Sequence, residues 1–142
     1  MASHRSFFII RGINGIATPA GDWHFDLLEV LSGYGASARC KLNEVCAIMG
    51  FPGKFGVDGS KVASMIDQGR VQEVRDYCET DVLNTYLVYL RYQMHTGNLS
   101  VESYNRCIAD VISLIETTKV EQPNRGEFLK AWGNACGNEF TI

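Results

Sequence analysis

The sequence predicts a mainly helical domain, with one or two short N-terminal strands at most. Three observations predict this fold class. Beyond residue 41, apolar residues recur at the spacing of amphipathic helices. Glycines stand where these periodic runs end, as they commonly do at helix C-termini. A chain of 142 residues, of which 46% are hydrophobic, is long enough to bury one core, so we predict a single domain over residues 1–142.

The N-terminal segment is the least regular part of the sequence. Residues 6–11 carry a short β-like run, and the rest of the segment is rich in Gly, Asn and Pro, which is typical of turns. We therefore interpret residues 1–21 as a loose or remodelled arm and residues 22–137 as the helical part. Within residues 22–37 an apolar set ends in Ser-Gly-Tyr-Gly, which allows either a short strand or a helical turn.

Two shorter helices are predicted next. The first begins near Lys41 and ends at Gly50. A glycine-rich loop separates it from the second, for which Ser60 is positioned as the N-cap and Gly69 as the terminating residue. We therefore expect this second helix over residues 61–68.

The longest periodic run follows and ends at Gly97. Ser100 is then positioned as the N-cap of another amphipathic helix, and the short connection predicts that these two helices are antiparallel. Pro123 is expected to break the chain before a last short helix, which runs from about Gly126 to Cys136.

Composition says more about where the protein resides than about what it does. The net charge of −3 gives no overall attraction to nucleic acid, so a polyanion would need a local basic patch or bound metal. The five cysteines are odd in number and include no C-x-x-C pair, which favours a reduced, cytoplasmic protein. No stretch approaches the roughly 18 consecutive apolar residues that a membrane span needs, and we expect no membrane partner.

Tyr77 and Asp81 form the first candidate site. They lie four residues apart on the longest predicted helix, so their side chains share one face. A carboxylate there can ligate a divalent cation, and a tyrosine hydroxyl one turn earlier can hydrogen-bond a water molecule. The alternative is that Asp81 faces solvent and Tyr77 packs along the helix, and the spacing alone does not decide between the two.

The glycine-rich loop over residues 50–62 is the second candidate. Glycines let backbone N–H groups approach a phosphate, and Lys54 and Lys61 add positive charge, although the loop does not match the P-loop pattern. A turn between helices contains the same residue types.

Asp26 and Glu29 are an acidic pair and form the third candidate. We interpret this pair as a solvated helix face rather than as metal ligands.

Three stretches together resemble one family. They are FDLLEVLSGYGAS (25–37), KLNEVCAIMGFPGKFGVDGSKV (41–62) and VRDYCETDVLNTYLVYLR (74–91). In order and spacing they are similar to blocks of the predicted 3′-to-5′ exonucleases related to the proofreading domain of family B DNA polymerases. The resemblance covers roughly residues 23–132 and includes a GEFLKAW block near the C-terminus.

The resemblance implies a fold, a cofactor and residue roles. The fold would be RNase H-like α/β, with two divalent metals, Mg²⁺ or Mn²⁺, on four acidic residues. The family's third motif, Y-x-x-x-D, falls on Tyr77 and Asp81. This match assigns the positioning of the attacking water to Tyr77 and metal ligation to Asp81. The reaction would be phosphodiester hydrolysis from the 3′ end of DNA or RNA.

The sequence also departs from the family's pattern. The first motif, a D-x-E pair, and the aspartate of the second motif would both precede Asp26, but the only carboxylate upstream is Asp22. We therefore expect the C-terminal part of such an exonuclease, in which the central sheet and most of the metal ligands are missing.

Two hypotheses for the function follow. One hypothesis is an exonuclease that a second chain completes. The other is an inactive helical remnant that acts as a binding or oligomerisation module, and we expect a homo-oligomer.

Overall fold

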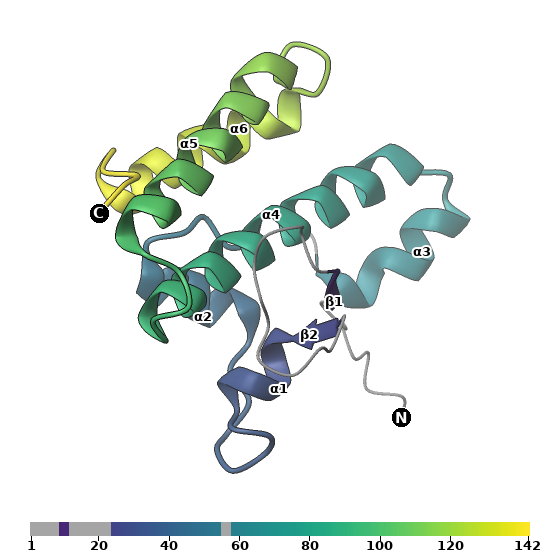
Figure 1. The fold of residues 1–142 in the computed structure, drawn as a ribbon. Helices are drawn as coiled ribbons and strands as arrows, with labels where there is room; N and C mark the ends of the chain where they lie inside the picture. Colours follow the sequence, from purple (N-terminus) through teal and green to yellow (C-terminus); the bar gives the residue numbers. More distant parts are fainter. Residues whose placement is uncertain (1–8, 12–23, 55–57) are drawn as a thin grey trace.

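A computed structural model describes residues 9–11, 24–54 and 58–142 (Figure 1). Over these residues the protein is mainly helical, as predicted. Two short strands, β1 (Ile9–Arg11) and β2 (His24–Asp26), pair antiparallel. The helices are α1 (Leu27–Leu31), α2 (Leu42–Met49), α3 (Val62–Asp67), α4 (Val71–His95), α5 (Val101–Thr118) and α6 (Pro123–Cys136), and the 3₁₀ turn η1 (Gly59–Lys61) precedes α3.

Residues 24–31 form a strand followed directly by a helical turn, so both alternatives open for this segment occur. Asp26 makes the change of direction, because its Oδ1 accepts hydrogen bonds from the backbone N–H groups of Leu28 at 2.9 Å and Glu29 at 3.2 Å. These are the bonds of an N-cap. Asp26 therefore ends β2 and caps α1, and only Glu29, which is exposed, lies on a solvated helix face as predicted. The predicted strand over residues 6–11 is present at 9–11, and residues 6–8 lie outside the described residues.

The helix α2 ends at Gly50 as predicted, with a φ of 74°. The next helix begins within one residue of the predicted Lys61, but its predicted cap was wrong. Ser60 is not the N-cap: Asp58 Oδ1 accepts a hydrogen bond from the Ser60 N–H at 3.1 Å and opens η1, so that α3 begins at Val62. A carboxylate two residues earlier takes the capping position that the hydroxyl was expected to hold.

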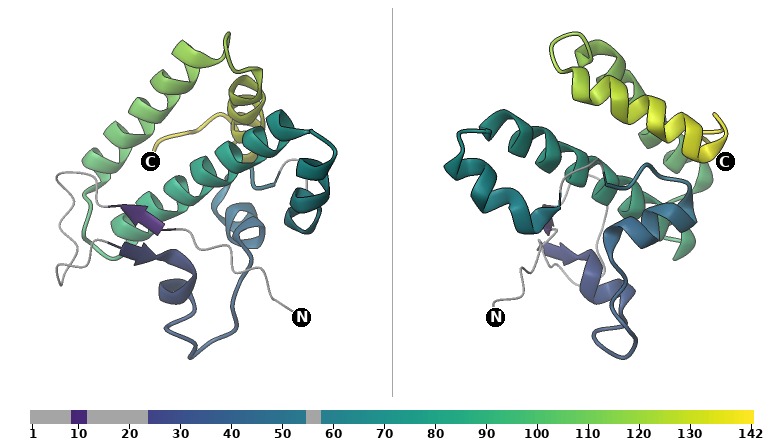
Figure 2. Two further views of the ribbon diagram at one scale, coloured as in Figure 1. Left: turned by 90° about the vertical axis from the view of Figure 1, so that its right-hand side faces the viewer. Right: turned by 180° about the vertical axis from the view of Figure 1, so that it is seen from behind.

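The long helix α4 and its successor α5 follow the predicted pattern. Ser100 caps α5, because its Oγ accepts a hydrogen bond from the Ser103 N–H at 3.1 Å. The chain reverses at the turn, but α4 and α5 spread apart from it instead of packing along their whole length (Figure 2). Pro123 does not break the chain before the last helix. It occupies the first turn of α6, where its missing N–H costs no hydrogen bond, so α6 starts before Gly126.

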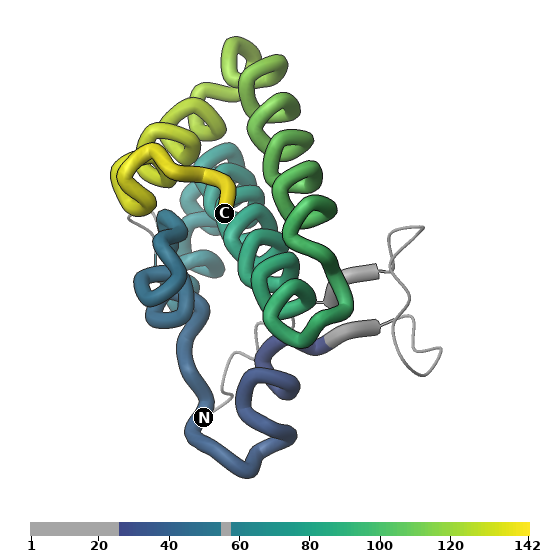
Figure 3. Tube along the Cα trace, turned by 60° about the vertical axis from the view of Figure 1, so that its left-hand side comes forward, coloured from purple at the N-terminus to yellow at the C-terminus, as the bar shows by residue number. Residues whose placement is uncertain are grey.

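The hydrophobic core lies where α4, α5 and α6 meet. Figure 3 shows α6 beside α5, with the C-terminal end returning toward the centre of the molecule. Trp132 of α6 is almost fully buried and makes edge-to-face contacts with Phe51, Phe128 and Phe140, with ring centroids 6.3, 6.3 and 5.0 Å away. Such aromatic pairs add to the free energy that burial of their surface provides. The C-terminal half of α4 packs in this core, and the N-terminal half of α4 contacts α3.

Two expectations from composition concern the cysteines and the membrane. All five cysteines are free thiols, as a reducing environment would leave them, and the cytoplasmic location stays a prediction. Among the helices of the described residues, none has the length and apolar character to cross a membrane.

Candidate functional site

The predicted pair on α4 comes together in the structure. The Tyr77 hydroxyl and the Asp81 carboxylate lie one helical turn apart, close enough for hydrogen bonding between them to shift the pKa of both groups. Both side chains are partly buried. This is the geometry that the four-residue spacing predicts, and it differs from the alternative in which Asp81 points into solvent.

The surroundings of the pair shift its proton equilibria. Burial raises the pKa of the Asp81 carboxyl, and the hydrogen bond from Tyr77 and the charge of Lys54 oppose that rise. Burial and the hydrogen bond to Asp81 raise the pKa of Tyr77 to about 12, and the negative charge of Asp81 adds to this. Tyr77 therefore remains a neutral hydroxyl that can donate a hydrogen bond at physiological pH.

The loop that carries Lys54 is fixed to α4 by Asn84. The Asn84 Nδ2 donates to the Gly53 carbonyl at 2.7 Å, and the Gly53 N–H donates to Asn84 Oδ1 at 3.1 Å. On the other side, the Lys54 N–H donates to Asn43 Oδ1 at 2.9 Å. Gly53 has a φ of 70°, and a Cβ there would lie 2.4 Å from Asn43 Oδ1. Only glycine fits this backbone conformation without displacing its neighbour.

A buried thiol lies beneath this loop. Cys46 of α2 is fully buried and interacts with the backbone of Gly53. Burial raises the pKa of the Cys46 thiol to about 12, the hydrogen bond with Gly53 opposes this shift, and the charge of Asp81 adds to it. The thiol is therefore neutral and acts as an apolar filler next to Asp81, not as a nucleophile.

The turn η1 closes the site on the other side of Tyr77. A Cβ on Gly59 would lie 3.2 Å from the Tyr77 hydroxyl oxygen, so the turn and the tyrosine are in close contact. Asp58 precedes this glycine and is exposed. Hydrogen bonds from the Ser60 backbone and hydroxyl lower the pKa of the Asp58 carboxyl, and the charges of Lys54 and Lys61 lower it further. The structure thus brings both predicted lysines into the neighbourhood of one carboxylate.

Asp58 is a site residue that the sequence interpretation missed. Its charge contributes to the raised pKa of Tyr77, which places it in the electrostatic environment of the pair. The sequence Asp-Gly-Ser directly before a helix is a capping pattern, and this pattern identifies Asp58 as a cap. It does not reveal that the turn packs against Tyr77.

The carboxylates in this site do not by themselves form a two-metal centre. Such a centre needs several carboxylates around two closely spaced ions. Across residues 9–11, 24–54 and 58–142, no group of three or more His, Cys, Asp or Glu side chains is arranged to hold a metal ion. Asp81 is hydrogen-bonded to Tyr77, and Asp58 is engaged by Ser60 and faces two lysines. The donor set therefore does not fit the metal pair that the family resemblance implies.

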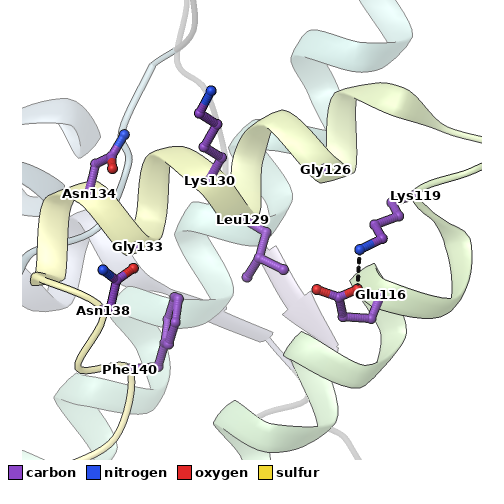
Figure 4. Close-up of a pocket in the computed structure, with 9 residues that line it drawn as sticks. All are labelled: Glu116, Lys119, Gly126, Leu129, Lys130, Gly133, Asn134, Asn138 and Phe140. Carbon is purple, nitrogen blue, oxygen red and sulfur yellow. Dashed lines mark hydrogen bonds and ion pairs between the residues drawn. The ribbon is translucent and has the colours of Figure 1, made fainter.

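A hollow lies elsewhere on the molecule, between α5, α6 and the C-terminal segment (Figure 4). Its volume is about 340 Å³, and the Lys119–Glu116 ion pair borders it. None of the residues around Tyr77 and Asp81 contributes to its lining, so the two places are separate. The lining residues are Glu116, Lys119, Gly126, Leu129, Lys130, Gly133, Asn134, Asn138 and Phe140.

Comparison with known families gives one match. Residues 15–132 match the family of predicted 3′-5′ exonucleases related to the exonuclease domain of PolB. The matched range contains Tyr77, Asp81 and the loop with both lysines. The chain belongs to this family. Membership implies a nucleic-acid substrate and the use of metal ions. No curated protein and no solved structure matches the chain.

Proposed function

We propose that the protein takes part in 3′-to-5′ exonucleolytic hydrolysis of nucleic-acid phosphodiesters. The observation that carries this proposal is the hydrogen-bonded pair Tyr77 and Asp81, which lies at the third motif of the matched family. Asp81 is the carboxylate that this chain contributes toward a metal site. Tyr77, held neutral by its raised pKa, is the hydroxyl that orients the attacking water.

The two lysines serve as contacts for the nucleic-acid backbone in this proposal. Lys54 and Lys61 are exposed and lie near Asp58, at the edge of the site. Lysine ammonium groups bind phosphates mainly through charge, with little dependence on base sequence. This fits a nuclease that removes nucleotides of any sequence, from either DNA or RNA.

Two further acidic motifs complete the site. The described residues lack the carboxylates for two Mg²⁺ or Mn²⁺ ions, and among residues 1–23 the sequence has only Asp22. We infer that the missing acidic residues come from a segment that carries the family's first two motifs, on this polypeptide or on a second one. That segment would also supply the central sheet of an RNase H-like fold, against which the helices described above would pack.

The test is digestion of a 5′-labelled single-stranded oligonucleotide with Mg²⁺ or Mn²⁺. The chain is assayed alone and mixed with the N-terminal part of a complete family member that is inactive by itself. Laddering from the 3′ end is expected in the mixture and is expected to disappear with Asp81→Ala. Asp110→Ala is the matched control, because Asp110 is an exposed aspartate on a different helix, α5, and it should leave the laddering intact.

Each outcome has a distinct meaning. Laddering by the chain alone that depends on Asp81 would keep the function but place the missing carboxylates in a second copy of the chain. Laddering that survives Asp81→Ala would remove Asp81 from the site. Absence of laddering in every mixture would overturn the proposed activity.

A second candidate function is a binding or self-association module without catalysis. Large apolar side chains are exposed on the described helices, including Ile48 at 85% and Val82 at 64% of their full exposure. Exposed apolar groups favour association when they form a continuous surface. Under this alternative the purified protein forms a homo-oligomer whose mass, measured by light scattering, decreases when Ile48 and Val82 are replaced by Ser. A monomer at high concentration would contradict it.

A further inference from the structure

We infer that Asn84 is a positioning residue of the candidate site: by holding Gly53 from both sides of its backbone, it sets the place of Lys54 for contact with a nucleic-acid phosphate. The inference rests on the proposed function for its phosphate contact. The positioning itself rests on geometry alone. Asn84 lies on α4, the helix that also carries Tyr77 and Asp81.

The Asn84 carboxamide binds both backbone polar groups of Gly53. The carboxamide both donates to and accepts from the same residue, at 2.7 and 3.1 Å, as a neighbouring β-strand would. Asn84 is completely buried, and Gly53 is buried too. Because both polar groups of Gly53 are bound, the loop cannot shift or rotate there without leaving buried groups unpaired, which is costly.

The hydrogen bonds at Gly53 also restrict the backbone position of Lys54. This residue follows Gly53, and its own N–H is bound by Asn43 Oδ1 at 2.9 Å. The Lys54 side chain is exposed, and its charge acts on both Asp81 and Asp58. Among the ion pairs of the described residues, none involves Lys54. Its ammonium group is thus held at the edge of the site while remaining available to an anionic ligand.

The chain contains a matched control for this contact. On α5, Asn105 makes the same two-sided clamp to the C-terminal residue: its Nδ2 donates to the Ile142 carbonyl at 2.7 Å, and the Ile142 N–H donates to Asn105 Oδ1 at 3.0 Å. This clamp holds a chain end and no site residue. Asn105→Ala therefore removes a pair of hydrogen bonds with the same pattern, here exposed to solvent, without touching the loop.

The first measurement is the binding of a 5′-fluorescein single-stranded oligonucleotide by fluorescence anisotropy, in EDTA and over a series of salt concentrations. Loss of one phosphate contact lowers the log–log salt slope by about 0.7, which corresponds to about fivefold in affinity near 0.1 M salt. We expect this loss from Lys54→Gln and an equal loss from Asn84→Ala. The double variant should lose no more than either single variant, and Asn105→Ala should bind like the wild type.

The second measurement is amide hydrogen exchange at Gly53 and Lys54, which does not depend on nucleic acid. Faster exchange is expected in Asn84→Ala and unchanged exchange in Asn105→Ala. Asn43→Ala is the milder variant in case Asn84→Ala fails to fold, because Asn43 is exposed and also holds this loop. It should reproduce both the faster exchange and the loss of affinity, to a smaller extent.

The outcomes separate the inference from the proposed function. Unchanged exchange in Asn84→Ala, or losses of affinity that simply add in the double variant, would overturn the positioning role. Faster exchange in a protein whose wild type binds no oligonucleotide would keep the positioning of Lys54 and overturn its phosphate contact together with the proposed substrate.

Discussion

The two halves of α4 differ in burial and in what they carry: one half packs in the core, and the other half carries the candidate site. Its C-terminal half lies in the core, where Leu87, Val88 and Leu90 are fully buried. Its N-terminal half contacts α3 and carries Tyr77 and Asp81, which are only partly buried. The comparison teaches that the stability of the helix comes from one end. The other end can therefore keep a polar pair whose burial costs free energy.

The largest expected effect comes from the core. Trp132→Ala should lower the free energy of unfolding by about 3–5 kcal/mol, because it removes a buried indole and its three aromatic neighbours lose contact. Urea unfolding measures this change. The exposed Val82→Ala, on the same helix as the site, should stay within about 0.5 kcal/mol of the wild type. Equal effects of the two substitutions would contradict the division between core and site.

The second-largest effect is expected in the loop that contains Gly53. Gly53→Ala should destabilise the protein by about 1–3 kcal/mol, because alanine is disfavoured at positive φ, and its Cβ would also press on Asn43. Gly137→Ala is the control, since Gly137 has a φ of 64° but no atom within 4 Å of its Cβ position. Thermal unfolding should show the larger loss for Gly53. A smaller loss at Gly53 than at Gly137 would mean that the loop is free to move.

A smaller effect is expected within the site pair. Tyr77→Phe removes a hydrogen bond between partly buried groups and should cost about 0.5–1.5 kcal/mol. Because that hydrogen bond lowers the pKa of Asp81, the variant should also raise this pKa, which ¹³C NMR of the carboxyl carbon measures. Tyr34→Phe, at a tyrosine that is 79% exposed, should change neither quantity. An unchanged Asp81 pKa in Tyr77→Phe would argue against the hydrogen bond in solution.

The smallest effect is a dependence on pH. Burial raises the pKa of Asp81 in the folded protein above its value in the unfolded chain. The folded state then binds this proton more tightly, so the contribution of Asp81 to stability is present at low pH and is lost as pH rises through the raised pKa. Asp81→Asn cannot lose a proton, and we expect it to gain stability relative to the wild type as pH rises from the pKa of an aspartate in an unfolded chain, about 3.9, through the raised pKa of Asp81.

Urea unfolding at a series of pH values measures this difference, with the exposed Asp110→Asn as control. A difference between Asp81→Asn and the wild type that shrinks as pH rises would have the wrong sign and would reject a raised pKa.

Much of the helical fold could be predicted because its determinants are local. Apolar periodicity placed α2, α4 and α5, and glycine and serine ends set most of their boundaries. The cap before α3 and the start of α6 were not predicted correctly. Asp58, and not Ser60, accepts the capping hydrogen bond. Pro123 lies in the first turn of α6 instead of separating this helix from the preceding segment.

The candidate site could be predicted only where its contacts are local. Tyr77 and Asp81 are one turn apart, so helical geometry alone brings them together. The bond between Asn84 and Gly53 joins residues 31 positions apart in sequence. No periodic pattern reports such a contact, because it depends on how the loop folds back over α4. The contact of Gly59 with Tyr77 was missed for the same reason.

The placement of three site residues on one helix has a consequence for assembly. Tyr77, Asp81 and Asn84 are spaced along about 10 Å of α4, given its rise per residue. Their relative positions are set by the internal hydrogen bonds of the helix and not by what packs around it. The Tyr77 hydroxyl, the Asp81 carboxylate and the Asn84 anchor of the lysine loop therefore move as one rigid unit with α4. Under the proposed function, their alignment with the remaining carboxylates of a metal site reduces to placing a single helix.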